Sequence, residues 1–336
     1  MSFPAIRAEA LAKSFGEVRA LNGIDLDVPA GTVYGLLGPN GAGKTTAVRI
    51  LTTILWPDGG RAEVLGLDVT RHPQRVRESI GLAGQYAAVD ENLTGRENLR
   101  LVGRLTHLPS RRIAARADEL LERFGLTDAA NRPARTYSGG MRRRLDLAAA
   151  LVHRPPVLFL DEPTTGLDVA SRSDLWQVIE ELVDEGATLL LTTQYLEEAD
   201  HLAERIAVVD RGRIIAEGTP TQLKAGLGNT VVTITLDDPA AAPSAAAVLE
   251  PHAQVAPRLD GATVELTVDD GARRLVDVLR ALDSAGLQPA GLTVREPSLD
   301  DVFLSLTGHH AGGDPSPDGA GPSGNGAQPA VARGAA

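Results

Sequence analysis

The chain lacks cysteine and has few aromatic residues. With 0 cysteines among 336 residues, it can form neither disulfides nor thiolate-ligated zinc or iron–sulfur sites, and it has no cysteine nucleophile. Aromatic residues make up only 3% of the chain, and the formal net charge is −11. Proteins that bind nucleic acid usually present positive charge and rings on which bases stack. We therefore expect no nucleic-acid partner.

Long apolar runs are also missing. The longest, at residues 148–152 and 188–191, are far shorter than the ~20 residues that span a bilayer. The first twelve residues include Arg7 and Glu9, so they do not have the pattern of a secretory signal peptide. We expect a chain that is not secreted and does not cross a membrane. A function at a membrane would then require a partner that crosses it.

The periodicity of apolar residues predicts an α/β protein. The length of 336 residues corresponds to about two domains of ~150 residues each. The N-terminal part alternates like strands, and a helical part follows, clearest at residues 111–124. From residue 156 onward apolar strands alternate with helices, which is typical of βαβ units and a parallel sheet. The expected strands are 6–11, 24–28, 33–37, 61–65, 157–160, 188–191 and 206–209, and the later helices are 171–184 and 195–204.

The composition changes after about residue 228. Strand-like segments at 230–236, 263–268 and 292–294, with a helical stretch at 272–284, predict a small separate α/β domain over residues 229–308. Beyond it, residues 309–336 are mostly Gly, Pro, Ala, Ser and Asp. Such a segment cannot bury enough apolar surface to become ordered, so we expect a disordered tail.

A glycine-rich loop after the strand at 33–37 matches the phosphate-binding pattern G-x-x-x-x-G-K-[ST]. Its residues are Gly38, Pro39, Asn40, Gly41, Ala42, Gly43, Lys44, Thr45 and Thr46. Glycines let consecutive N–H groups point at phosphate oxygens, and the next helix adds the positive end of its dipole. We expect Lys44 to reach the β- and γ-phosphates and Thr45 to bind Mg²⁺. The alternative is an ordinary glycine-rich turn before a helix.

Two adjacent carboxylates end the apolar strand at 157–160. They are Asp161 and Glu162, followed by a proline, and ligands of open α/β sheets bind at this end of the strands. We expect Asp161 to hold Mg²⁺ through water and Glu162 to polarise the attacking water as a general base. The alternative is that Asp161 only caps the next helix.

The segment Tyr137-Ser138-Gly139-Gly140-Met141 is followed directly by Arg142-Arg143-Arg144-Leu145 and lies about twenty residues before the acidic strand. It resembles the signature loop and helix of the ATP-binding subunits of ABC transporters. In that family Ser138, Gly139 and Gly140 would clasp a γ-phosphate from a helix start. Read on its own, the segment is an N-cap and a loop. The resemblance covers about residues 4–225.

The resemblance implies a P-loop NTPase core with a mixed sheet, an antiparallel β subdomain at the N-terminus and a helical signature subdomain. These would make up an ATP-binding domain at residues 1–228, with the helical subdomain at about 86–152. It also implies ATP and Mg²⁺ as ligands and two copies of the chain that enclose ATP head to tail. The further partner would be a separately encoded integral membrane permease, with the chain peripheral at the cytoplasmic face of the cell membrane.

Further residues match the family in order. Phe15 corresponds to the aromatic residue that stacks on adenine, and Gln85 to the glutamine that contacts Mg²⁺ and water beside the membrane partner. Residues 166–168 correspond to a loop by which the paired subunits touch. Phe15 could instead be a buried strand residue, and Gln85 a solvated loop residue.

Three positions depart from the family pattern. Tyr137 and Met141 stand where Leu and Gln are commoner, and Gln194 stands where the family usually has histidine. Glutamine can donate a hydrogen bond to a γ-phosphate, but it cannot carry a proton or a positive charge. We expect Gln194 to act with Glu162 and Lys44 in hydrolysis, with slow turnover or full reliance on Glu162.

Within the family, the chain is similar to antibiotic self-resistance subunits of the daunorubicin/doxorubicin type. Residues 93–99, Gln194 and residues 298–304 carry this similarity. It implies an ATPase that powers the export of a drug or antibiotic-like compound. The alternatives are a soluble ABC-type ATPase without a membrane partner, a regulator that binds ATP without turnover, and an exporter of lipid or polysaccharide. The apolar face of residues 299–306 could pack on its own domain, which we favour, or on a partner subunit.

Overall fold

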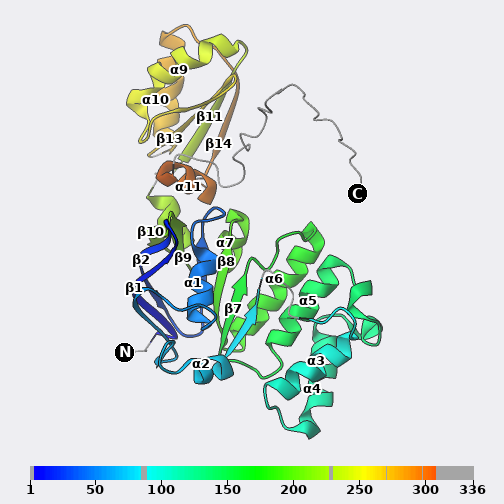
Figure 1. Cartoon of the computed structure of the whole chain (residues 1–336). Coiled ribbons are helices and arrows are strands. Elements are labelled where there is room, and N and C mark those ends of the chain that lie inside the picture. Colours follow the sequence, from blue (N-terminus) through cyan, green and yellow to red (C-terminus); the bar gives the residue numbers. More distant parts are fainter. Residues whose placement is uncertain (1–3, 85–88, 227–229, 270, 297, 308–336) are drawn as a thin grey trace, which may run out of the picture.

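The computed structural model describes residues 4–84, 89–226, 230–269, 271–296 and 298–307 (Figure 1). These residues form three sheets with helices packed against them. The α/β class, the mixed central sheet, the antiparallel N-terminal sheet and the helical subdomain that the sequence predicts are confirmed. The expected tail at 309–336 and Gln85 lie outside the described residues.

The N-terminal sheet is antiparallel, with the strand order β2-β1-β4-β5. Its strands are β1 (Ile6–Phe15), β2 (Val18–Val28), β4 (Gly59–Val64) and β5 (Leu67–Asp68). Alternate residues of β2 from Ile24 onward are buried and exposed, as expected for a sheet with one face on a core and one in solvent. The buried face packs on the central sheet and α1 (Lys44–Leu51).

The central sheet has the order β10-β9-β3-β8-β7-β6. All neighbours are parallel except β9 and β10, which form a hairpin. Three strands are buried along their whole length, because both faces of the sheet are covered. The strands are β3 (Val33–Leu37), β6 (Ile80–Ala83), β7 (Val157–Asp161), β8 (Thr188–Thr193), β9 (Arg205–Asp210) and β10 (Arg213–Gly218).

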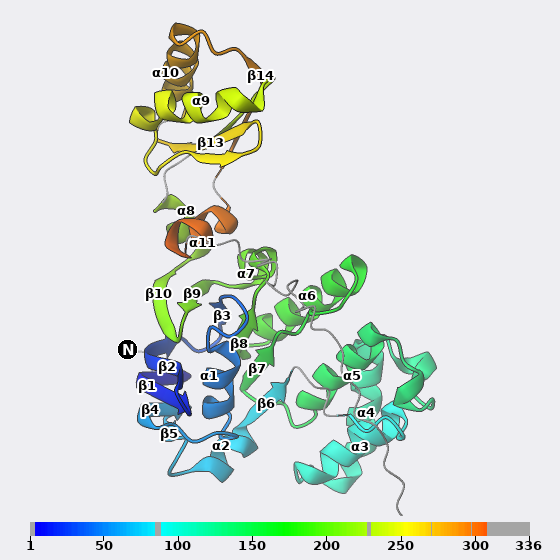
Figure 2. The same ribbon diagram turned by 45° about the horizontal axis from the view of Figure 1, so that its top comes forward.

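Helices complete this part of the chain, and three of them form a subdomain beside the central sheet (Figures 1 and 2). These three are α3 (Gly95–Leu105), α4 (Ser110–Arg123) and α5 (Gly139–Ala150). The buried stripe of α4 contains Ile113, Ala117, Leu120 and Leu121, the spacing of one helical face. The others are α2 (Pro73–Ser79), α6 (Val169–Asp184), α7 (Leu196–Leu202) and α8 (Pro220–Ala225), with short 3-10 turns at Thr127–Ala129 and Ala134–Thr136.

The C-terminal part has its own sheet and core. Its elements follow the pattern βαββαβ, and the all-antiparallel sheet has the order β12-β13-β11-β14. Buried side chains of β11, β13, α9 and α10 form a separate apolar cluster. The elements are β11 (Thr230–Leu236), α9 (Ala242–Leu249), β12 (Arg258–Asp260), β13 (Thr263–Val268), α10 (Gly271–Ser284) and β14 (Pro289–Arg295), with 3-10 turns Pro239–Ala241 and Glu250–His252.

The last described helix, α11 (Leu299–Thr307), returns to the first domain. Leu299, Val302 and Phe303 are buried in the same core cluster as the α7 residues Leu196 and Ala199. The helix lies between the C-terminal sheet and α7, beside α8 (Figure 2). Its apolar face therefore packs within the chain, but on the core that contains α7 rather than on its own small α/β domain, which we favoured.

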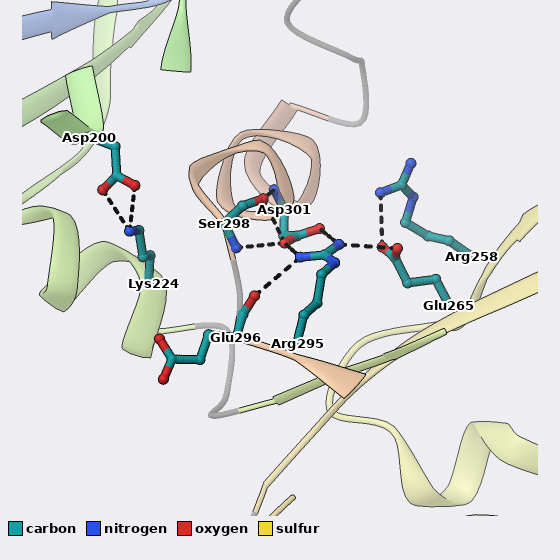
Figure 3. Close-up of polar contacts among 8 residues, drawn as sticks. All are labelled: Asp200, Lys224, Arg258, Glu265, Arg295, Glu296, Ser298 and Asp301. Carbon is teal, nitrogen blue, oxygen red and sulfur yellow. Dashed lines mark hydrogen bonds and ion pairs between the residues drawn. The ribbon is translucent and has the colours of Figure 1, made fainter. Parts of the chain in front are cut away.

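A polar junction joins the C-terminal sheet to α11 (Figure 3). Arg295, at the end of β14, donates hydrogen bonds of 2.6 and 2.9 Å to the two carboxylate oxygens of Asp301, and one of 3.1 Å to Glu265 on β13. Ser298 also donates to Asp301, from its N–H at 2.7 Å and its hydroxyl at 2.8 Å. The start of α11 is thus bonded to two strands of the sheet.

Candidate active site

The glycine-rich loop lies between the end of β3 and the start of α1. At Gly38 a Cβ would lie 2.2 Å from the carbonyl oxygen of Val209 on β9, so any side chain would clash with backbone. Gly43 has φ of +110°, and a Cβ there would lie 2.5 Å from the carbonyl oxygen of Ala20 on β2. Glycine is required at both positions. The first two sheets thus hold the loop between them.

Lys44 bonds the backbone of this loop with its own side chain. Its Nζ donates to the carbonyls of Gly38 at 2.6 Å and Pro39 at 3.0 Å, and it lies 3.6 Å from Oε1 of Glu162. Burial lowers the pKa of Lys44, while the nearby carboxylates of Glu162 and Asp161 oppose this shift. The buried ammonium group is thus compensated mainly by carboxylate charge and by carbonyls.

The two carboxylates adjoin the loop. Asp161 accepts hydrogen bonds from the hydroxyls of Thr45 at 3.1 Å and Thr192 at 2.5 Å. The N–H of Glu162 donates to Thr192, to its carbonyl at 3.0 Å and its hydroxyl at 3.1 Å. The following helix, α6, is capped by Asp168, whose side chain accepts from the N–H of Ser171. The alternative that Asp161 caps this helix is therefore wrong.

The donor set suits a magnesium nucleotide. Mg²⁺ is usually held by one or two carboxylates, phosphate oxygens and water rather than by a full cage of side chains. The Thr45 hydroxyl and the Asp161 carboxylate lie together beside the loop, and the described residues contain no cluster of three or more His, Asp or Glu that would form such a cage. The N-terminus of α1 has no capping side chain, which leaves its N–H groups available for phosphate.

Gln194 lies just beyond the end of β8, where the chain turns into α7. The carbonyl of the preceding Thr193 accepts a hydrogen bond of 3.2 Å from the N–H of Gly38. This bond keeps the Gln194 segment next to the first residue of the glycine-rich loop. The structure therefore brings together the loop, both carboxylates and the segment of Gln194.

Phe15 lies at the end of β1, outside this group. Its side chain is 50% exposed, so the alternative of a buried strand residue is wrong. The Nζ of Lys13 lies 5.8 Å from the centre of its ring, and Lys13 is held there by Asp58 at 2.6 Å. The ring is available for stacking.

The Ser-Gly-Gly segment begins α5, on the far side of α6 from α1 (Figures 1 and 2). Ser138 is the N-cap, and its hydroxyl accepts from the N–H of Met141 at 3.2 Å. Ser138 and Gly139 are exposed, and a Cβ at Gly139 would meet nothing within 4 Å. The segment is thus open to a ligand or a partner, although no described hydrogen bond joins it to the loop of its own chain.

The two unusual neighbours of this segment have structural roles. Tyr137 is buried, and its hydroxyl donates to the carbonyl of Ala129 at 2.7 Å. The side chain of Met141 packs partly buried against the main core. Both residues therefore hold the start of α5 against the rest of the domain.

Thr192 was not predicted from the sequence, although it bonds the carboxylate of Asp161 and the backbone N–H of Glu162. Thr192 pairs directly with Asp161 in the parallel register of β7 and β8. No local motif marks it, because the contact depends on which strands are neighbours. A polar residue near the end of an apolar strand was the only available signal.

Comparisons with known proteins agree with this geometry. Residues 21–165 match the ABC transporter family. A daunorubicin resistance ATP-binding protein of Streptomyces coeruleorubidus is 56% identical over 307 residues, which are 91% of this chain and 95% of that protein. The chain belongs to the ATP-binding proteins of ABC transporters. It is accordingly an ATPase that uses ATP with Mg²⁺ and drives transport through a separate permease.

Three further matches describe this ABC protein. Residues 218–307 match the family described as "ATP-binding protein DrrA1-3-like, C-terminal domain". A Nod factor export ATP-binding protein of Ralstonia nicotianae is 39% identical, covering 91% of this chain and 95% of that protein. A solved dimeric ATP-binding cassette, bound to ADP and phosphate in a post-hydrolysis state, has a TM-score of 0.59 and 25% identity, covering 64% of this chain and 98% of that one.

Within the residues that the structure describes, no helix is both long enough and apolar enough to cross a bilayer.

Proposed function

We propose that this ABC protein powers the export of a drug or antibiotic-like compound by a membrane permease. The observation that carries the proposal is its 56% identity to a daunorubicin resistance protein, over 91% of the chain. The similarity includes the C-terminal domain, which matches a family of its own. The resemblance to drug-resistance proteins thus extends beyond the ATP-binding part and covers most of the chain.

The proposed working unit is a head-to-tail dimer. Ser138, Gly139 and Gly140 of one copy would close on ATP held by the glycine-rich loop of the other copy. Two observations support this arrangement: the segment is exposed at a helix start, and it lies across α6 from the loop of its own chain. A helix N-terminus with an exposed hydroxyl suits a phosphate group.

In the proposed hydrolysis, Glu162 takes a proton from the attacking water as the general base. Lys44 and the loop N–H groups hold the β- and γ-phosphates, and Gln194 donates a hydrogen bond to the γ-phosphate. Thr45 and Asp161 would hold Mg²⁺, and that ion would supply positive charge next to the phosphate oxygens. The support is the proximity of these groups: Lys44 lies 3.6 Å from Glu162, and Thr45 3.1 Å from Asp161.

The remaining roles lie at the edges of this site. Phe15 would stack on adenine, which its half-exposed ring permits. Gln85 would contact Mg²⁺ and water beside the permease, and the chain would sit at the cytoplasmic face of the membrane. The domain division at residue 228 is supported by the separate apolar cluster of the C-terminal sheet.

Export of a compound other than a drug is a second candidate function. The Nod factor export protein is 39% identical, so related proteins serve cargo other than drugs. The higher identity of the drug-resistance relative, 56%, favours the drug-like cargo.

A pull-down from detergent-solubilised native membranes tests the partner. We expect a polytopic membrane protein in near-equal amount with the tagged chain. Recovery of ribosomes or of nothing, with ATPase activity left in the soluble fraction, would contradict the proposal.

Accumulation of daunorubicin, which is fluorescent, tests the cargo. Cells in which Glu162→Gln replaces the natural chain should accumulate more of the compound than cells with the wild-type chain. Equal accumulation, together with an intact complex in the pull-down, would contradict a drug of this class as cargo. It would favour the export of a compound other than a drug.

A further inference from the structure

The guanidinium group of Arg143 joins three segments of the chain at the acidic end of β7. Its Nε donates to the carbonyl of Pro163 at 2.7 Å, and its Nη2 donates to the carbonyl of Asp161 at 3.1 Å. Its Nη1 donates to the carbonyl of Gly84, just after β6. Arg143 itself belongs to α5, the helix that begins after Ser138.

The carbonyls of Asp161 and Pro163 stand on either side of Glu162 in the chain. The geometry points to Arg143 as a positioning residue that fixes the backbone of Glu162 and thereby aims its carboxylate. This inference rests on the proposed role of Glu162 as the general base. It assigns to an arginine on α5, the helix that begins after Ser138, the task of holding that base in place.

The backbone of Glu162 needs such support. Its φ is +51°, in the left-handed region that residues other than glycine, asparagine and aspartate rarely adopt. A residue stays there only when its surroundings fix it. Thr192 binds the N–H of Glu162, and Arg143 binds the carbonyls on both sides. Together these bonds restrain the peptide unit that precedes Glu162 and the one that follows Pro163.

Arginine is suited to this task by its shape and charge. Its planar group carries five donors in a fixed arrangement, so one side chain can bond several carbonyls at once. The side chain of Arg143 is only 11% exposed, and Asp146 lies 3.5 Å away. Burial lowers the pKa of Arg143, while Asp146 and Asp161 oppose that shift. The buried charge is thus partly compensated by neighbouring carboxylates.

The position of Arg143 on α5 links two parts of the proposed dimer. The first turn of α5 would clasp the nucleotide of the other copy, whereas Arg143 holds Glu162 of its own copy. A movement of α5 on closure would therefore reach Glu162 through Arg143. Closure of α5 on the nucleotide of the other copy would thus position Glu162 at the nucleotide of its own copy.

A double-mutant cycle tests this role. We expect Arg143→Gln to lower kcat for ATP about tenfold or more, with KM for ATP changed less than about threefold, and Arg143→Lys to restore part of the loss. In a Glu162→Gln background, Arg143→Gln should lower the residual turnover no further, because it acts through Glu162. A further loss equal to that in the wild type would overturn the inference.

Arg116 provides a matched control. Its side chain is also 11% exposed and donates to two backbone carbonyls, of Leu151 at 2.7 Å and Val152 at 3.3 Å, but it lies on α4. Arg116→Gln should lower the melting temperature about as much as Arg143→Gln while leaving kcat unchanged. An equal fall of kcat in both variants would assign the effect to general destabilisation and overturn the inference. If Glu162→Gln itself left turnover unchanged, the proposed base would fail instead.

Discussion

The hydroxyl of Thr45 donates a hydrogen bond of 3.1 Å to Asp161, across 116 residues of sequence. Thr45 belongs to the first turn of α1, and Asp161 ends β7. The bond exists because β3, which leads into the loop, and β7 both pair with β8, so that their carboxyl ends lie at one edge of the sheet. The loop and the acidic strand therefore form one site.

Replacing Thr45 tests the proposed magnesium position. Thr45→Ala removes one oxygen ligand, so the Mg²⁺ concentration for half-maximal hydrolysis should rise about tenfold or more. The measurement is ATPase activity titrated with Mg²⁺ at fixed ATP. Thr52→Ala is the control, since Thr52 bonds the carbonyl of Val48 at the other end of α1. An unchanged Mg²⁺ requirement in Thr45→Ala would exclude this ligand.

Gln194 should contribute a hydrogen bond to the γ-phosphate. A hydrogen bond to a charged group is worth about 1.5–3 kcal/mol, so Gln194→Ala should lower kcat by about 10- to 100-fold. Single-turnover hydrolysis measures this loss directly. Turnover equal to that of the wild type would remove Gln194 from the site.

The junction at Asp301 should make stability depend on pH. Burial alone would raise the pKa of Asp301, but hydrogen bonds from Arg295 and Ser298 outweigh it and hold the pKa at about 2, below the usual 3.8. The folded state then binds its proton less readily than the unfolded state. The stabilisation is complete above about pH 5 and is lost as the pH falls towards 2.

Urea unfolding of Asp301→Asn measures this contribution. At pH 7 the variant should be less stable than the wild type by about 1 kcal/mol, after allowance for solvent around the half-exposed Arg295. The difference between the two proteins should shrink between pH 5 and pH 3. A difference that stays constant over this range would show that the charge of Asp301 does not matter.

Phe303 should anchor α11 to the ATP-binding domain. Because its side chain is buried in the main core, Phe303→Ala should destabilise the protein by about 3–5 kcal/mol. Leu306, on the same helix but 43% exposed, is the control, and Leu306→Ala should change stability by less than about 0.5 kcal/mol. Calorimetry that gave equal effects for both variants would contradict the observed docking of α11.

The elements with strong local patterns could be predicted from the sequence. The strands at 33–37, 230–236 and 263–268 have the bounds that were expected, because apolar runs or strict alternation mark them. The strands β6 and β10 were missed. β6 has only four residues, and β10 is an edge strand with a mixed pattern, so neither has a periodicity that stands out.

The residues of the candidate site also fall into those that local motifs predict and those that they do not. Lys44, Asp161 and Glu162 could be predicted because contiguous motifs contain them. Thr192 and Arg143 could not, since their contacts depend on strand order and on the packing of α5, which no local pattern encodes. The destination of α11 was missed for the same reason: its apolar face is visible in the sequence, whereas the surface that covers it is not.

Two copies of the chain should enclose ATP, and Glu162 should act as the base for its hydrolysis. Light scattering of Glu162→Gln with saturating ATP and Mg²⁺ tests this most directly, with the nucleotide-free protein as reference. Removal of the base should leave binding intact and slow hydrolysis by about 10²–10⁴-fold, so we expect a stable dimer of twice the monomer mass. A variant that binds ATP yet stays monomeric would exclude the proposed ATP-enclosing dimer.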